Sequence, residues 1–451
     1  MKSSSAIRSG IVWLLAFVFF FSSHLIQAQS TAKETDFAAQ AASVTEFEVN
    51  GLKVLLKKRS GSPTVAVGLF IRGGSRNIDQ KTAGIERLML NSAIEAGKNL
   101  PRAAVRRQLA SIGANLGVET SEDFSNVNLA CTRADFEKAF NIYSTLLISP
   151  EFNPSDIARV KEQILTALRE TEAVPEGALD AMEEKIIYQG HPYSNRVDGT
   201  VSTIQSFSPA DIKNYHKKIM QTSQLLLVIV GDFDRKDIEP LIANTFGKLP
   251  RGNYSPKPLP RLDFSQATLD VSPKSLPTNY VRGVFAAPTL SDKDYYAMRV
   301  AIAILQSLVY QEVRGRLQLS YAPDADIDNL ESNTANISVS TTDPNTATAA
   351  MLAQIKLLQN RTLDPRIIDE IASFFLTRYY MGQETSLAQV GELAKYELVA
   401  GSWRRSFDFI DGVRNVTPSD IRMVANKYMK NIRFLYVGDP EAVNKMTYLN
   451  Q

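Results

Sequence analysis

Few residues of this sequence belong to the types that carry out enzymatic chemistry. The chain has 451 residues, of which three are histidines and one is a cysteine. His24 falls in an apolar N-terminal stretch, so the remaining chain keeps His191 and His216. Neither lies near the other or near Cys131 in sequence, and no Ser-His-Asp or Cys-His arrangement emerges. These residues therefore predict neither a zinc site nor a histidine-activated nucleophile.

Each of these residues has an ordinary structural interpretation. Cys131 lies in the strand-like run NVNLACTRADF, where it is typical of a small buried hydrophobe. His216 falls in a helical segment and is interpreted as a partly exposed residue of the helix face. His191 precedes a proline in QGHPYSN, a pattern that favours a turn and a structural or capping role.

A predicted helix in the first half of the chain carries polar residues within its apolar pattern. The stretch GIERLMLNSAIEAGK at 84–98 has the periodicity of an amphipathic helix, yet it carries Arg87 and Asn91 one turn apart. Packed core positions do not favour such side chains. The pattern raises the question of why a core helix carries them.

The elements that position these residues form two copies of one unit. SPADIKNYHKKIMQTSQLLLVIVGD, from Ser208, is similar to TPSDIRMVANKYMKNIRFLYVGD, from Thr417, and each predicts a capped helix followed by a buried strand. FNPSDIARVKEQILTALRE is likewise similar to LDPRIIDEIASFFLTRYYM. Pro209 and Pro418 are 209 residues apart, and Pro154 and Pro365 are 211 apart. Two equivalents at nearly one spacing predict a duplicated domain of about 200 residues.

The boundaries of the copies follow from composition. RGNYSPKPLPRLDF at 251–264 contains three prolines and predicts a linker between an N-terminal domain at 29–250 and a C-terminal domain at 265–451. Adjacent strands joined by short turns, with long helices elsewhere, favour an α+β fold over a doubly wound parallel sheet. We therefore expect two homologous α/β-sandwich domains.

The N-terminus predicts export. Lys2 and Arg8 precede the apolar run IVWLLAFVFFF, and a small residue, Ala28, follows at a plausible cleavage point, so residues 1–28 have a signal-peptide pattern. An uncleaved anchor helix is the alternative. The mature chain would be periplasmic or extracellular, with one cysteine and no internal disulfide. The 50 basic and 48 acidic residues nearly cancel, which argues against a nucleic acid partner.

The order of these segments resembles the pitrilysin and insulinase family of inverted-motif zinc peptidases, in particular its two-domain subunits such as those of the mitochondrial processing peptidase. The landmarks GGSRN, AGIERLMLNSAIEAG, HPYSNRVDGT, LLLVIVGDFD, FGKLPRG and VRGRLQLSY carry the resemblance. The resemblance implies the pitrilysin-like metallopeptidase fold, which agrees with the two homologous α/β-sandwich domains expected above.

The resemblance also implies where a zinc site would lie. In the family, a helix with His-x-x-Glu-His supplies two zinc ligands and a Glu that polarises water, and a Glu about 76 residues further on is the third ligand. These positions correspond to Arg87, Leu90, Asn91 and Ala167. Because none of the four residues can replace its counterpart, the resemblance implies no metal and no cofactor in this chain.

A second group of family residues is retained. Active members carry an Arg and a Tyr, seven residues apart, that hold the substrate backbone and the developing oxyanion, and these correspond to Arg314 and Tyr321 in EVRGRLQLSYAPD. From spacing alone, a solvated Arg and a packed Tyr are the simpler interpretation. The family's glycine-rich loop before this Arg is missing from AILQSLVYQEVR, and Gly117 and Val118 replace its edge-strand Asn-Ala pair.

The N-terminal domain has lost the zinc-site residues, whereas the C-terminal domain retains Arg314 and Tyr321. This difference between the two domains suggests two functions. The first is a non-catalytic subunit of an exported heterodimeric zinc metallopeptidase, in which Arg314 and Tyr321 serve a homologous partner that has an intact His-x-x-Glu-His motif, holds the zinc and cleaves peptides or unfolded segments. The alternative is a peptide-binding or assembly protein of the same fold without a proteolytic role. In either case the chain alone is expected to be inactive.

Overall fold

The computed structural model describes residues 37–451. Residues 1–28, for which the sequence predicts a signal peptide, lie outside the described residues. Of the described residues, 37–44 belong to one unit, in which 37–42 are helical, and Thr45–Gln451 form a second, compact unit. Within the described range, no helix combines the length and apolar composition needed to cross a membrane.

The first half of the compact unit contains a six-stranded sheet. Its order is β1 (Val44–Val49), β2 (Leu52–Lys58), β6 (Leu225–Gly231), β3 (Thr64–Arg72), β5 (Phe124–Thr132) and β4 (Asn115–Thr120). β2 and β6 are parallel, whereas β3 is antiparallel to both β5 and β6. β6, with the sequence LLLVIVG, is buried along its whole length because it lies in the middle of the sheet.

The first half also contains the following helical segments. They are α2 (Ile85–Ala93), α3 (Arg102–Ser111), α4 (Phe136–Ile148), α5 (Pro154–Ala173), α6 (Pro175–Met182), α7 (Val201–Ser206), α8 (Pro209–Ile219) and α9 (Arg235–Asn244), with the short segments η1 (Gly74–Asn77), η2 (Glu183–Ile187), η3 (Pro192–Ser194), η4 (Thr222–Gln224) and η5 (Phe246–Lys248). The apolar faces of α2, α4, α5, α8 and α9 share one core with alternate residues of β3.

The second half repeats this plan. Its sheet has the order β7 (Thr268–Pro273), β11 (Arg433–Gly438), β8 (Asn279–Ala286), β10 (Thr334–Thr341) and β9 (Asp324–Ile327). The helical segments are α10 (Tyr295–Val309), η6 (Tyr310–Arg316), α11 (Pro344–Asn360), α12 (Arg366–Gly382), α13 (Ser386–Val399), α14 (Arg405–Arg414), α15 (Pro418–Tyr428), η7 (Pro440–Ala442) and α16 (Lys445–Leu449). Residues 251–264, between the halves, contain neither helix nor strand.

The two halves share topology as well as sequence. In each sheet a parallel pair, β2–β6 or β7–β11, is followed by an antiparallel neighbour, β3 or β8. The helices before β6 and β11 begin with the same capping box, formed by Ser208 with Asp211 in α8 and by Thr417 with Asp420 in α15. The predicted α+β fold with a duplicated unit is confirmed.

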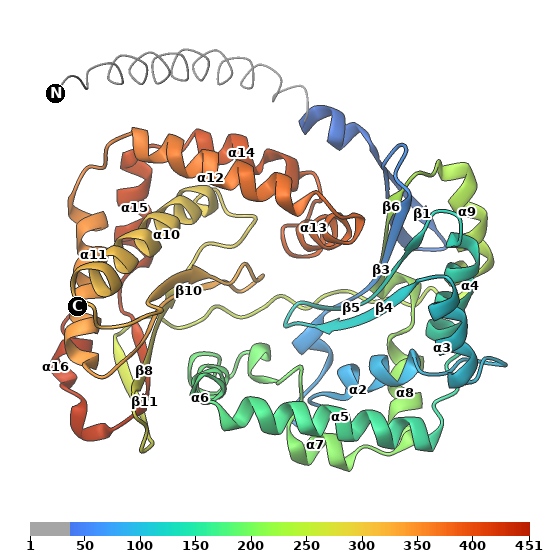
Figure 1. Cartoon of the computed structure of the whole chain (residues 1–451), viewed down its shortest axis with the longest axis horizontal. Helices are drawn as coiled ribbons and strands as arrows, with labels where there is room; N and C mark the ends of the chain where they lie inside the picture. Colours follow the sequence, from blue (N-terminus) through green and yellow to red (C-terminus); the bar gives the residue numbers. More distant parts are fainter. Residues whose placement is uncertain (1–36) are drawn as a thin grey trace, which may run out of the picture. The chain divides into compact units, whose positions relative to one another are not determined.

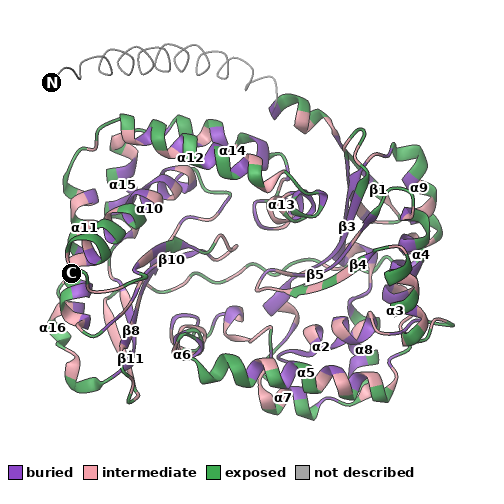
Figure 2. Cartoon of the chain, in the orientation of Figure 1, coloured by how far each residue is buried: buried purple, intermediate pink, exposed green. Residues whose placement is uncertain are grey.

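Each half also covers the sheet of the other. α13 of the second half packs on β3 and β6, and α6 of the first half packs on β8 and β11 (Figure 1). A Cβ on Gly68 of β3 would lie 2.7 Å from Cγ1 of Val390 in α13, which shows how closely this helix approaches the strand. β3 is therefore buried on both faces (Figure 2), and its run VAVGLFI is apolar without alternation.

Candidate functional site

Arg87 projects from α2 toward the turn that precedes α7, and Asn91 lies one turn further along the same helix. α2 starts after Gly84, which has φ 82°, and a Cβ there would lie 2.6 Å from Cα of Gly199 in that turn. This close approach brings Arg87 Nη1 to 3.1 Å from Oδ1 of Asp198. The side-chain amide of Asn91 donates a hydrogen bond to the carbonyl oxygen of Arg87 at 2.8 Å. Both side chains are partly exposed and have local partners.

The four positions that correspond to the family's zinc site do not fit a zinc ion. Arg87 has no acceptor atom in its side chain and is ion-paired, and Asn91 directs its amide to its own helix. Leu90 is 1% exposed within the core of the first half, and Ala167 on α5 has no donor atom in its side chain. Among residues 37–451, no group of three or more His, Cys, Asp or Glu side chains could hold a metal ion.

Carboxylates are frequent around Arg87. Burial raises the pKa of Glu122, and the negative charge of Asp198 adds to this increase. Burial also raises the pKa of Glu184 to about 7, against the opposing charge of Arg196, whose Nε lies 2.8 Å from Oε2 of Glu184. The ion pair of Arg87 with Asp198 therefore lies in an acid-rich region of the first half.

Arg314 and Tyr321 are brought together at the end of α10. The helix continues without a break into η6, and Nη1 of Arg314 donates a hydrogen bond to the backbone carbonyl oxygen of Tyr321 at 2.9 Å. The guanidinium carbon lies 4.9 Å from the ring centroid of Tyr310 and 5.2 Å from that of Tyr321. Tyr321 is 86% exposed. Its hydroxyl makes no hydrogen bond with any other residue in the described part of the chain.

An open pocket of about 620 Å³ adjoins this pair, with Thr278, Ser340 and Thr341 on its wall. It lies at the Thr341 end of β10. The Thr334 end of the same strand contacts the first half, where the hydroxyls of Thr334 and Tyr188 are 3.0 Å apart. Seven residue steps along a strand span about 24 Å. Arg87 does not line this pocket, and its contacts with Asp198 and Asn91 both lie within the first half.

The histidines and the cysteine have structural surroundings. Nδ1 of His191 accepts a hydrogen bond from the Tyr193 N–H at 3.1 Å and caps η3, and burial lowers the pKa of His191 to about 4. Nε2 of the partly exposed His216 is 2.8 Å from the carbonyl oxygen of Leu147. Cys131 is buried, which raises its thiol pKa to about 11. These surroundings agree with the capping, helix-face and core roles predicted for them.

Sequence reasoning missed a polar cluster that joins the two halves. Nη2 of Arg76 lies 2.6 Å from Oε2 of Glu331 and 3.7 Å from Oδ1 of Asp123. The other oxygen of Asp123 accepts a hydrogen bond from the Glu331 N–H at 2.8 Å. GGSRN, which contains Arg76, was noted only as a family landmark. Its partner Glu331 is 255 residues away in sequence, so only the fold brings the two together.

Two family models match the chain. The model described as "Insulinase (Peptidase family M16)" matches residues 53–201, and the model described as "Peptidase M16 inactive domain" matches residues 206–373. Together they extend from β2 in the first half to α12 in the second. The first model covers the degenerate zinc-site positions and the second covers Arg314 and Tyr321.

Curated relatives include subunits of mitochondrial complexes. The chain is 24% identical to cytochrome b-c1 complex subunit 1 of Bos taurus over 288 residues, which is 62% of this chain and 60% of the relative. It is 20% identical to the mitochondrial-processing peptidase subunit beta of Saccharomyces cerevisiae over 429 residues, 89% of this chain and 92% of the relative. The chain thus matches about three fifths of the first relative and nearly the whole of the second.

Solved structures share the fold. A peptidase M16 inactive domain from Pseudomonas fluorescens is 19% identical, with a TM-score of 0.80 over 88% of this chain and 98% of that chain. The first half of the periplasmic protease PqqL from Escherichia coli is 14% identical, with a TM-score of 0.71 over 90% of this chain and 95% of that chain. Two matched family models, similar subunits and a shared fold lead to one conclusion: the chain belongs to peptidase family M16, the insulinase family, as a non-catalytic member.

Proposed function

We propose that this chain is the non-catalytic subunit of an exported heterodimeric zinc metallopeptidase. Its partner is a homologous chain with an intact His-x-x-Glu-His motif, which holds the zinc and cleaves peptides or unfolded segments. In this assembly the chain supplies Arg314 and Tyr321 to the partner's site.

The observation that carries this proposal is the separation of the two parts of the site within the chain. Arg314 and Tyr321 line an open pocket whose other lining residues also belong to the second half, whereas Arg87 lies on α2 of the first half and pairs with Asp198. The pair is therefore suited to a substrate that is held by another chain.

The two side chains provide suitable donors for a peptide carbonyl. The Tyr321 hydroxyl is exposed, and the Arg314 guanidinium uses one N–H for the carbonyl oxygen of Tyr321, which fixes its orientation and leaves further N–H donors. Donors held in place before the reaction stabilise negative charge that develops on a carbonyl oxygen. The chain's own contribution is to orient the substrate and to donate these hydrogen bonds.

The subunit role and the export are supported by different observations. The names of the two mitochondrial relatives describe subunits of larger assemblies, which favours a partner chain. The charged and apolar pattern of residues 1–28 favours export, as does the similarity to a periplasmic protease.

The experiment is to substitute Tyr321→Phe in a co-expressed pair of this chain and a homologue that has the intact motif. Turnover of a quenched peptide should fall roughly tenfold to a thousandfold, the range for losing one oxyanion donor. Because Tyr321 is exposed, the heterodimer should still assemble, which size-exclusion chromatography checks.

Tyr280→Phe in β8 is the matched control, because it also removes one hydroxyl and Tyr280 does not line the pocket. It should leave turnover unchanged. Equal turnover for Tyr321→Phe and the unmodified chain, in a heterodimer shown to be intact, would rule out the proposed role of this pair.

A second function is favoured by the uninterrupted passage from α10 into η6, because no loop is present there to grip a substrate. On this view the chain is a peptide-binding or assembly protein without a proteolytic role, and a similar protein is named as a subunit of the cytochrome b-c1 complex. Absence of peptidase activity in every combination of this chain with its homologues would support it.

A further inference from the structure

A pocket of about 550 Å³ in the second half lies outside the site described above. It is bounded by α10, β9, α12, α13 and α14, and it shares no lining residue with the pocket beside Arg314 and Tyr321. Phe374, Phe375, Tyr379, Tyr396 and Phe409 contribute aromatic rings to its wall. A concave wall that combines aromatic rings with a few polar and charged groups is typical of a ligand site.

The internal repeat relates this pocket to the degenerate zinc-site positions of the first half. Ala167 and Arg378 are 211 residues apart, the same spacing as Pro154 and Pro365 at the starts of the corresponding helices. Arg87 lies 212 residues before Arg299 in the same way. Both Arg299 and Arg378 line the pocket. It therefore occupies, in the second copy, the place that the degenerate zinc site occupies in the first.

Three cationic side chains from three helices line this pocket: Arg299 of α10, Arg378 of α12 and Lys395 of α13. Within residues 37–451, Arg378 and Lys395 make no salt bridge, and Arg299 has only Asp326 at 4.0 Å. The guanidinium carbons of Arg299 and Arg378 lie over Phe375 and Phe374, at 5.3 Å and 5.5 Å from the ring centroids. Their N–H groups are thus held by stacking and remain largely without anionic partners.

The carboxylates of the pocket neutralise these cations only in part. Asp324 accepts a hydrogen bond from Gln306 at 3.0 Å, and the side chain of Asp326 is 66% exposed. Glu392 accepts a hydrogen bond from Gln383, and burial raises its pKa to about 7, so it carries a partial negative charge at neutral pH. The positive charges of Arg299 and Arg378 are therefore incompletely neutralised and can attract an anion into the pocket.

One wall of the pocket is a sheet edge. β9 is the outermost strand of its sheet, and Asp324, Ala325 and Asp326 of this strand line the pocket. Edge strands have unpaired backbone groups to which an extended peptide can add. Inorganic anions gain nothing from such an edge or from aromatic walls, whereas the end of a peptide uses both.

We propose that this pocket binds the C-terminal end of a peptide with an apolar last residue. The terminal carboxylate lies between Arg299, Arg378 and Lys395, because guanidinium groups bind carboxylates through paired hydrogen bonds. The last side chain packs against Phe374 and Phe409. The site selects free C-termini, and it functions whether or not the chain belongs to a heterodimeric peptidase.

The test is isothermal titration of the full mature chain with N-acetyl-Phe-Leu and with its C-terminal amide. We expect the free acid to bind at least about tenfold more tightly than the amide. Arg378→Gln and Lys395→Gln should each weaken binding of the acid by roughly tenfold to a hundredfold, the range for losing a charged hydrogen bond. Arg378→Lys keeps the charge without the paired donors, so its affinity should lie between those of the unmodified chain and Arg378→Gln.

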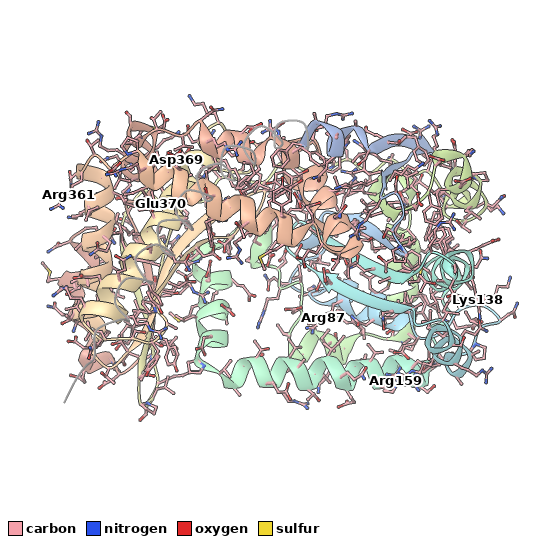
Figure 3. The ribbon with its side chains drawn as sticks, turned by 45° about the horizontal axis from the view of Figure 1, so that its top comes forward. Arg87, Lys138, Arg159, Arg361, Asp369 and Glu370 are labelled. Carbon is pink, nitrogen blue, oxygen red and sulfur yellow. The ribbon has the colours of Figure 1, made fainter. Side chains whose placement is uncertain are left out.

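Arg361→Gln is the control, because Arg361 is exposed at the outer end of the second half and does not line the pocket (Figure 3). It should leave the affinity unchanged, and circular dichroism checks that each variant is folded. Equal binding of acid and amide would overturn the proposal. So would binding of inorganic phosphate as tight as that of the acid, or affinities that do not change in folded Arg378→Gln and Lys395→Gln variants.

Discussion

Arg87 contributes a permanent charge to a part of the molecule where several carboxylates are buried. Its ion pair with Asp198 and the hydrogen bond from Asn91 to its backbone give both polar side chains a partner without a metal. Because both side chains occupy former metal-site positions, they are expected to face water, and their partial exposure agrees with this expectation. The identity of the partner, Asp198, could not be predicted, because it depends on the close contact of Gly84 with Gly199.

We expect the unmodified chain to bind no stoichiometric zinc, because neither Arg87 nor Ala167 can be a ligand. The triple variant Arg87→His, Asn91→His and Ala167→Glu supplies three ligand side chains and leaves the buried Leu90 in place. It should bind about one zinc per chain, as measured by atomic absorption after dialysis. A chelator-sensitive equivalent of zinc in the unmodified chain would contradict the first expectation. A folded triple variant without zinc would show that these positions do not converge on one point.

Single elements in this fold depend on partners that are far away in sequence. The capped helices α8 and α15 could be predicted locally, because Ser208 and Thr417 satisfy the helix ends with residues three positions further on. The apolar run of β3 indicated burial on both faces, but its second cover, α13, begins more than 300 residues later and carries no local signal of this packing. The pocket around Arg378 has no local signal either, because its lining residues come from five elements between Arg299 and Phe409.

The contact between β3 and α13 predicts a stability effect at Gly68. A Cβ there would lie 2.5 Å from Cε2 of Phe70 and 2.7 Å from Cγ1 of Val390, so Gly68→Ala forces the ring or the helix to move. We expect the free energy of unfolding in urea to fall by about 1–3 kcal/mol, the usual cost of overpacking. Gly117→Ala in β4 is the control, because a Cβ there meets no atom within 4 Å. Equal stability of the two variants would mean that α13 does not pack closely on β3.

At the scale of the whole compact unit, the two halves are copies that complete each other. α6 covers β8 and β11, and α13 covers β3 and β6, so neither sheet has both faces buried by its own half. The apolar residues Leu179 and Ile187 of the first half share a core with Val284 and Leu435 of the second. The ion pair of Arg76 with Glu331 fixes the same boundary with polar contacts. The duplication was visible in the sequence, but this exchange of helices was not, because either copy has enough apolar residues to suggest an independent core.

This exchange predicts that the linker is not needed to hold the halves together. A protease site inserted at 255–257, within the segment that has neither helix nor strand, allows the purified chain to be cut in one place. We expect the two fragments to co-elute in size-exclusion chromatography and to unfold in urea in a single transition, because separation exposes apolar surface of both sheets. Arg76→Met with an intact linker is expected to lower the free energy of unfolding, since it leaves Asp123 without a nearby cation. Fragments that separate in native buffer and unfold independently would show that each half completes its own core, and that α6 and α13 are only loosely docked.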